Sequence, residues 1–339
     1  MKTIDADAHV IENERTWDYM EKTEHEFKPQ MVKSTNSGEP KDCWLIDGRL
    51  VPRTNVGKDT LQASRELGDI EARLKHMDEL GINMQILYPT VFIFPGARRA
   101  EVELALCRSY NRWMASICKK ALDRFRWIMV PPLLSMDKAL EELRLAKESG
   151  ACGIFRRGLE GDKYLSESYF FPLYEEAGKL DMPVCIHSGN GSFTHYDFFD
   201  HDSGFTQFKL AVVGAFHSLI FHRIPDRFPK LRFGIIEVSS QWLPYVIRDL
   251  AKRFQRRGEA LKQNLLQEHR IYVACQTDDD LPYVLQYAGE DNIVIGSDYG
   301  HADTSTELEA IKKLQQQGKL GENVLRKILD DNPRRLYSL

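Results

Sequence analysis

Long hydrophobic runs are missing from this sequence. No apolar stretch approaches the ~20 residues that a membrane-spanning helix needs. The first residues, Met1-Lys2-Thr3, lead directly into a predicted strand rather than into the apolar segment of a signal peptide. We therefore expect a cytoplasmic protein that does not work in a membrane.

An excess of positive charge is also missing. The chain carries 46 Lys and Arg against 50 Asp and Glu, which gives a formal net charge of -4. Such a balance lacks the basic surface typical of nucleic-acid binding. We expect a small-molecule substrate as the partner, with neither nucleic acid nor membrane involved.

Cysteine is sparse, and its spacing excludes the common cysteine-based sites. The six cysteines show no CxxC pair, which argues against a zinc ribbon or a disulfide framework. Several lie in or beside predicted strands. We predict that all six are reduced core residues.

What the sequence does contain is a regular alternation of short apolar, β-branched runs with helix-length amphipathic segments, the pattern of repeated βα units. The predicted strands span residues 4–10, 83–88, 126–130, 152–155, 184–187, 231–236, 270–275 and 292–296. The predicted helices span residues 69–80, 100–121, 136–149, 167–180, 206–221, 241–265, 279–288, 305–317 and 322–331. About eight such units close an α/β protein into a (β/α)₈ or TIM barrel, and 339 residues suit a single barrel domain over residues 1–339.

Two segments are too long to be plain connections. Residues 11–67, with a probable hairpin at 44–51, interrupt the first unit, and residues 188–205 interrupt the fifth. On a barrel both would leave from the catalytic face, so we predict that they form lids over the active site. The alternatives are an oligomer contact, since large barrel enzymes often form homodimers, or a floppy insertion.

Metal-type side chains fall at the ends of the predicted strands. Asp7 and His9 are two apart on the first strand and face the same side. His187 ends the fifth strand, and Asp298 follows the eighth. Because parallel strands deliver their carboxyl ends to one face of a barrel, we expect these four side chains to meet. Imidazole and carboxylate ligands suit Zn, Mn or Fe and leave one position open for water or substrate.

Five motifs together resemble the amidohydrolase superfamily, and within it the branch of aminocarboxymuconate-semialdehyde decarboxylase and the dihydroxybenzoate decarboxylases. They are Ile4-Asp5-Ala6-Asp7-Ala8-His9-Val10, Pro183-Val184-Cys185-Ile186-His187-Ser188-Gly189, Arg227-Phe228-Pro229-Lys230-Leu231-Arg232 with Trp242-Leu243-Pro244-Tyr245, Gly296-Ser297-Asp298-Tyr299-Gly300-His301, and Asp331-Asn332-Pro333-Arg334-Arg335-Leu336-Tyr337. The resemblance spans nearly the whole chain. It implies a metal-dependent hydrolase type of barrel with Asp7, His9, His187 and Asp298 as metal ligands, and either hydrolysis or loss of CO₂ without an organic cofactor.

The sequence departs from that resemblance at three points. Asp7 stands where many relatives have His or Glu, which favours Mn or Fe as well as Zn. Glu237 stands where the decarboxylases carry a catalytic histidine. The fourth strand ends in Phe155-Arg156-Arg157, without the lysine that is carbamylated in other branches.

Glu237 is therefore the residue whose role is most open. It could act as a general base, support a metal ligand, or bind a second ion together with His301 and His217, since a carboxylate and two imidazoles form a common ligand set. Histidines near an active site also often orient ligands or bind substrate. One ion is expected, and two are possible.

Four further residues are candidates for substrate binding. Arg156 or Arg157, at a catalytic strand end, would suit a bidentate grip on a carboxylate, although a structural ion pair is an equal alternative. His195 and His201 lie on the predicted second lid and would enter the site when it closes, or else remain solvent-exposed.

Three functional hypotheses follow. The first is a metal-dependent hydrolase or non-oxidative decarboxylase (carboxy-lyase) for a small carboxylated, possibly cyclic substrate, in which Glu237 moves protons beside Asp298 and His217. The second is a dinuclear iron or manganese oxygenase that hydroxylates its substrate with O₂. The third is a partner subunit that has kept the barrel and lost turnover.

Overall fold

The computed structural model describes residues 2–35, 40–53 and 55–339, and its centre is an eight-stranded parallel sheet. The strands follow one another in the order β1-β5-β6-β7-β10-β11-β12-β13. They are β1 (Ile4–His9), β5 (Met84–Tyr88), β6 (Phe125–Met129), β7 (Ala151–Arg156), β10 (Val184–His187), β11 (Phe233–Ile236), β12 (Ile271–Cys275) and β13 (Ile293–Ile295). Each corresponds to one predicted strand.

The sheet closes on itself where the segment after β13 meets β1. Asp298 N donates to the Asp7 carbonyl at 2.9 Å, and His9 N donates to the Tyr299 carbonyl at 2.8 Å. Gly296 permits this approach, because a Cβ at that position would lie 2.2 Å from the Cβ of Asp7. The predicted TIM barrel is confirmed.

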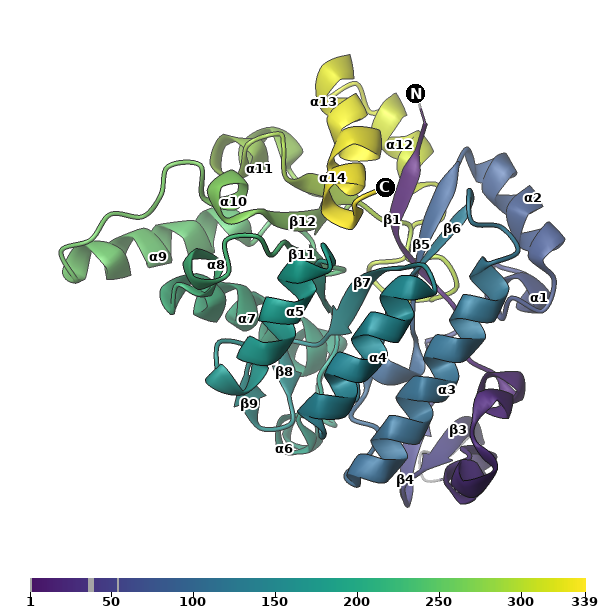
Figure 1. Ribbon diagram of the computed structural model, residues 1–339. Coiled ribbons are helices and arrows are strands. Elements are labelled where there is room, and N and C mark those ends of the chain that lie inside the picture. The colour runs from purple at the N-terminus through teal and green to yellow at the C-terminus, as the bar shows by residue number, and fades with distance from the viewer. Residues whose placement is uncertain (1, 36–39, 54) are drawn as a thin grey trace.

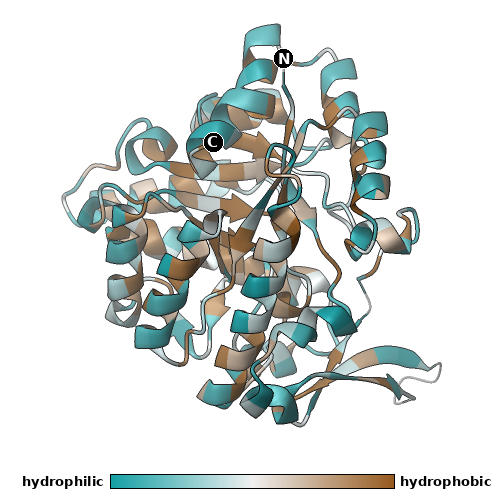
Figure 2. Cartoon of the chain, turned by 45° about the vertical axis from the view of Figure 1, so that its right-hand side comes forward, coloured by the Kyte–Doolittle hydropathy of each residue, from teal (hydrophilic) through white to brown (hydrophobic). Residues whose placement is uncertain are grey.

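Helices surround the sheet on its outer side (Figure 1). The main ones are α2 (Ile70–Leu80), α3 (Ala100–Cys118), α4 (Met136–Glu148), α5 (Phe171–Lys179), α7 (Leu210–Phe221), α9 (Leu243–Arg256), α11 (Leu281–Ala288), α12 (Ala310–Gln316), α13 (Glu322–Arg326) and α14 (Asn332–Tyr337). Figure 2 shows the apolar strands at the centre and hydrophilic residues over the surrounding helices, as amphipathic helices on a buried sheet require. In the part of the chain that the structure describes, no helix combines the length and apolarity of a membrane span.

Two predicted helices differ most from the observed ones. The helix predicted for 241–265 ends at Arg256, because Gly258 takes a left-handed φ of 71° and the chain resumes helical structure only in α10 (Leu265–His269). In the segment predicted for 305–317, the helix forms only over Ala310–Gln316.

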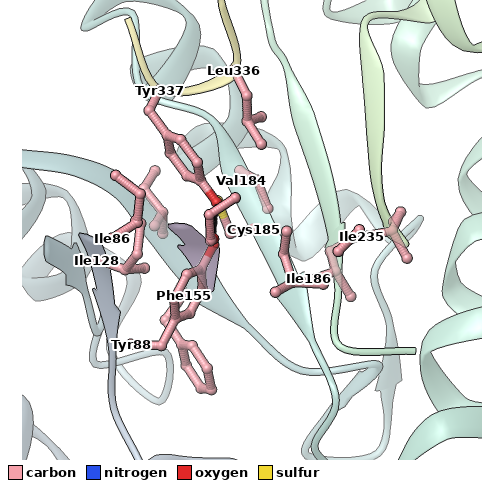
Figure 3. Packing of buried hydrophobic residues seen from close by; sticks show 14 of the residues in the cluster. Ile86, Tyr88, Ile128, Phe155, Val184, Cys185, Ile186, Ile235, Leu336 and Tyr337 are labelled. Carbon is pink, nitrogen blue, oxygen red and sulfur yellow. Dashed lines mark hydrogen bonds between the residues drawn. The ribbon is translucent and has the colours of Figure 1, made fainter. Parts of the chain in front are cut away.

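The C-terminal helix α14 forms the floor of the barrel. The Tyr337 hydroxyl donates to the Ala6 carbonyl at 2.8 Å and contacts the Tyr88 hydroxyl at 2.8 Å. Figure 3 shows Tyr337 and Leu336 reaching down to side chains of the inner strand faces, among them Cys185. All six cysteines are free and buried, which confirms that part of the prediction.

The described residues of the 11–67 segment fold into a small structure of their own beside the barrel. It comprises the 3₁₀ helices η1 (Glu14–Tyr19) and η2 (Lys22–Phe27), an antiparallel sheet of β2 (Gln30–Ser34), β3 (Lys41–Ile46) and β4 (Arg49–Pro52), and α1 (Gln62–Arg65). Strands β3 and β4 form the predicted hairpin, whose Asp47-Gly48 turn takes positive φ at both residues, as short hairpin loops favour.

The two insertions contact each other. Within residues 188–205 the chain forms α6 (Phe193–Phe198), which lies with β3 and β4 at the lower end of the molecule in Figure 1, opposite the N-terminus. Arg49 of β4 pairs with Asp197 of α6 and lies over the rings of Phe193 and Tyr196 at 5.2 and 5.4 Å. Both segments therefore lie at the end of the barrel where the strands finish.

Candidate metal centre

Residues at the ends of four barrel strands place their side chains in one buried cluster. Asp7 and His9 lie on β1, and His187 is the last residue of β10. Glu237 directly follows β11, and Asp298 follows β13. None of the five is more than 7% exposed. Parallel strands that end at one face bring these distant positions together, as the sequence predicts.

The backbone at two of these positions is strained. Glu237 and Asp298 take left-handed φ values of 63° and 52°, a conformation that costs a side-chain-bearing residue about 1–3 kcal/mol. Such strain persists where the surrounding structure imposes it, and it concentrates at functional sites. Here it accompanies the turn of both carboxylates toward the histidines of the cluster.

The donor atoms converge closely. His187 Nε2 lies 3.1 Å from His9 Nε2, 2.9 Å from Glu237 Oε2 and 3.3 Å from Asp7 Oδ1. His9 Nε2 lies 3.5 Å from Asp298 Oδ1. One group, formed by Asp7, His9, His187 and Glu237, has all its ligand atoms within 4.8 Å of one another.

The two imidazoles fit a shared cation. His9 Nδ1 lies 3.0 Å from the Pro89 carbonyl, and His187 Nδ1 lies 2.8 Å from the Ser188 carbonyl. A carbonyl only accepts, so each Nδ1 carries its hydrogen and each Nε2 presents a lone pair. Two lone pairs 3.1 Å apart repel each other unless a cation or a proton lies between them. A backbone carbonyl that fixes the histidine tautomer in this way is typical of a metal ligand.

The pKa values of the two histidines move in opposite directions. Burial lowers the pKa of His9 well below its usual value. Burial also acts to lower the pKa of His187, but the carboxylates of Glu237 and Asp7 outweigh it and raise that pKa well above its usual value. His187 therefore holds a proton more tightly than His9, and its nearest carboxylate is Glu237 at 2.9 Å.

The carboxylates of the cluster outnumber its positively charged groups. Burial raises the pKa of Glu237 to about 8, against the opposing charge of His187. Burial likewise raises the pKa of Asp298 to about 6, against the opposing charge of His301. A divalent cation would balance this buried negative charge, so the donor set fits a divalent metal ion.

His301 belongs to a second, overlapping group. Its ring stacks on His9 with centroids 3.6 Å apart, and its Nδ1 lies 2.8 Å from Asp298 Oδ1. Burial would lower the pKa of His301, but Asp298 and further carboxylates raise it to about 9. The ligand atoms of His9, Glu237, Asp298 and His301 also lie within 4.8 Å of one another.

Three further residues support the cluster. Thr90 Oγ1 lies 2.9 Å from His301 Nε2, and Thr306 Oγ1 donates to Asp298 Oδ2 at 2.7 Å. The buried carboxylate of Glu12 accepts the N–H groups of Thr90 and Val91. Thr90 could have been found from its place just after the second predicted strand, whereas nothing in the sequence pointed to Thr306.

His217 does not lie in the metal centre. Its Nε2 contacts Asp249 Oδ2 at 3.1 Å, between α7 and α9, and its ring stacks on Phe221. Helix α7 covers the outside of the barrel, so its side chains are separated from the inner face by the strands. The predicted role of His217 as a metal ligand or catalytic residue is therefore wrong.

Neither arginine at the end of the fourth strand reaches the metal centre. Phe155 faces His187 inside the barrel, with ring centroids 5.8 Å apart, and strand alternation sends Arg156 outward against Phe170. Arg157 donates to Glu160 and to the carbonyls of Phe92 and Phe94. Arg157 thus forms a structural ion pair with Glu160, the alternative to a grip on a substrate carboxylate.

The two loop histidines also lie apart from the cluster. His195 Nδ1 contacts the Asn190 amide at 2.5 Å, and its ring packs against Phe199. His201 is exposed. Their entry into the site on closure of the 188–205 segment stays a prediction.

The chain matches a known protein family over most of its length. The model of the family described as amidohydrolase matches residues 4–339. The chain is 34% identical over 145 residues to gamma-resorcylate decarboxylase of Rhodococcus jostii, a match that covers 39% of this chain and 43% of that protein, less than half its length. It is 22% identical over 291 residues to 2-amino-3-carboxymuconate-6-semialdehyde decarboxylase of Dictyostelium discoideum, covering 79% of each.

A solved structure has the same fold. The 5-carboxyvanillate decarboxylase of Novosphingobium aromaticivorans, determined with manganese, superimposes with a TM-score of 0.76 at 18% identity, covering 100% of this chain and 96% of that chain.

Proposed function

This chain belongs to the amidohydrolase family, as its motifs indicated, and on that premise we propose that it removes CO₂ from a small carboxylated aromatic substrate by metal-dependent, non-oxidative decarboxylation. The observation that carries the proposal is the convergence of two histidines and three carboxylates at the strand ends. Both curated relatives reported above are decarboxylases, and this favours CO₂ loss over hydrolysis.

We assign Asp7, His9, His187 and Asp298 as the residues that hold the metal, on the strength of their convergence and of the fixed histidine tautomers. Manganese, iron and zinc all suit this mixture of imidazole and carboxylate. When bound, the ion supplies Lewis acidity that polarises a substrate oxygen.

Glu237 is the residue we assign to proton transfer. Its carboxyl group faces the cluster from the end of β11 and contacts His187. In the proposed reaction the bond between the ring carbon and the carboxylate breaks, and its electron pair stays on the ring carbon. A proton from the Glu237 carboxyl group then forms the new C–H bond, CO₂ leaves, and solvent returns a proton to Glu237.

The proposal includes the two insertions as a cover over the metal centre. Residues 11–67 and 188–205 contact each other through Arg49 and Asp197 at the catalytic end of the barrel, which suits a cover that excludes water. A cytoplasmic homodimer remains part of the proposal, and light scattering on the purified protein checks the oligomeric state.

The test uses protein purified without chelator. We expect at least one equivalent of manganese, iron or zinc by elemental analysis, and CO₂ release from gamma-resorcylate or 5-carboxyvanillate. In D₂O the product should carry one deuterium at the carbon that lost CO₂. Absence of bound transition metal, together with activity that survives His187→Ala, would exclude the proposal.

A second candidate function is O₂-dependent hydroxylation by a dinuclear iron or manganese centre. The observation that favours it is the second group of ligand atoms, in which His301 joins His9, Glu237 and Asp298. Two metal equivalents, loss of one of them in His301→Ala, and substrate-dependent O₂ uptake would support it. One equivalent that is retained in His301→Ala would remove it.

A further inference from the structure

A cavity of about 470 Å³ opens between the loops that follow β5, β6, β7 and β10. Its walls include Phe92, Val130, Phe155 and Gly191. None of the described residues of the metal centre lines it. The Phe155 ring is a wall of the cavity on one side and contacts the His187 ring on the other. The cavity is therefore a neighbour of the metal centre and not part of it.

The rim of the cavity pairs cations with aromatic rings. Lys163 Nζ lies 5.2 Å from the ring centroid of Tyr169, and the Arg98 guanidinium lies 4.2 Å from that of Phe193. All four residues line the cavity. Arg49 by contact and Arg98 from a distance lower the pKa of the Asp197 carboxyl group, but neither cationic group of the rim forms an ion pair among residues 2–35, 40–53 and 55–339. The rim thus offers flat apolar surfaces and positive charge side by side.

A third pair of a cation and an aromatic ring lies behind the cavity wall. The Arg156 guanidinium lies 4.0 Å from the ring centroid of Phe170, which lines the cavity together with Glu160. Arg156 is 0% exposed, and in the described part of the chain its Nε and both Nη atoms find no hydrogen-bond partner. A buried guanidinium without partners is costly, and structures normally satisfy it.

The nearest carboxylate does not satisfy Arg156. Glu160 Oε1 lies 3.5 Å from Arg156 Nε, outside good hydrogen-bond geometry. The same carboxylate accepts hydrogen bonds from the backbone N–H and the side chain of Arg157. Glu103 is the second carboxylate of the cavity lining, and it interacts with both arginines. With Arg98 and Lys163 at the rim, four cationic side chains therefore meet two carboxylates, and positive charge is in excess.

We propose that this cavity is a second binding site, for a small aromatic carboxylate. The aromatic walls would stack on the ring of the ligand, and the surplus cations would attract its carboxylate. The volume lies within the roughly 300–1,000 Å³ of small-molecule sites. The site does not depend on the metal centre, because no metal-cluster residue contributes to it.

The test measures benzoate binding to the full-length, metal-free protein by calorimetry. We expect benzoate to bind, benzamide and cyclohexanecarboxylate to bind about tenfold more weakly or worse, and bound metal to leave the benzoate affinity unchanged. Benzamide has the ring without the charge, and cyclohexanecarboxylate has the charge without a flat ring, so the pair separates the two parts of the proposal.

Variants locate the site. Arg156→Met should weaken benzoate binding about tenfold by removing the buried charge, and Lys163→Met, at the partly exposed rim, should weaken it about threefold. Arg257→Met is the matched control, since Arg257 also lies over an aromatic ring, 3.8 Å from that of Phe221, but neither residue lines the cavity. This variant should leave the affinity unchanged. Lys163→Met keeps the test valid if Arg156→Met does not fold.

Three outcomes would overturn the proposal. These are failure of benzoate to bind the metal-free protein, loss of binding in His187→Ala, which would place benzoate at the metal centre, or an unchanged affinity in Lys163→Met and in folded Arg156→Met. Because the assay needs neither metal nor turnover, it fails or succeeds independently of the proposed decarboxylation.

Discussion

The metal centre and the cavity beside it are two charged regions of opposite sign: the first has an excess of negative charge, and the second has an excess of positive charge. The metal centre collects carboxylates whose negative charge is balanced by too few cations. The cavity collects guanidinium and ammonium groups with too few carboxylates. The Phe155 side chain touches both. Buried charge of either sign is costly unless paired, and the comparison therefore indicates a cation for one region and an anion for the other.

The largest expected effect falls on the metal centre and leaves the cavity unchanged. His187→Ala removes a strand-end ligand, so we expect metal content to fall below one equivalent and CO₂ release to fall at least about a thousandfold, about 4 kcal/mol in the barrier. Benzoate binding in the cavity should not change. His222→Ala, an exposed histidine at the end of α7, is the control for elemental analysis and activity.

A second prediction tests whether the regions are independent. Manganese at about one hundred times its Kd should raise the free energy of unfolding by about 2.7 kcal/mol, and benzoate at about ten times its Kd by about 1.4 kcal/mol. If the sites are separate, the two stabilisations add in denaturant or thermal unfolding. A combined effect smaller than the sum would mean that benzoate competes for the metal centre.

The smallest predicted effect is a pH dependence confined to the cavity. Burial raises the pKa of Glu103 to about 7, against the Leu134 N–H and the charges of Arg157 and Arg156, while Glu160 adds to the rise. Cys107 and Tyr169 also interact with this group, but burial raises the pKa of both, so they stay neutral near pH 7.

As pH rises through about 7, Glu103 loses its proton and adds negative charge to the cavity. Benzoate binding should therefore weaken about fivefold between pH 6 and pH 8, about 1 kcal/mol. Glu103→Gln should bind benzoate with the same affinity at both values. A variant that keeps the full pH dependence would show that another group is responsible.

The two regions also differ in how far sequence patterns revealed them. Asp7, His9, His187 and Asp298 could be selected because each lies at the end of a strand, and parallel strands end at one face of the barrel. His301 and His217 looked equivalent by residue type, yet one stacks on His9 and the other contacts Asp249 on the outside. Arg156 and Phe155 are adjacent in sequence, and strand alternation sends them to opposite faces.

The sequence by itself determined the barrel, its two insertions and the strand-end residues. Short apolar runs and the alternation of side chains along a strand are local properties of the sequence. The topology of the barrel then fixes where each strand end lies in space. Only the tertiary structure decided which histidines join the cluster, how Glu237 faces His187, and that four loops enclose a cationic, aromatic cavity. These features depend on side chains from separate loops meeting at distances of a few ångströms, and loop conformation is set by packing rather than by any periodic pattern in the chain.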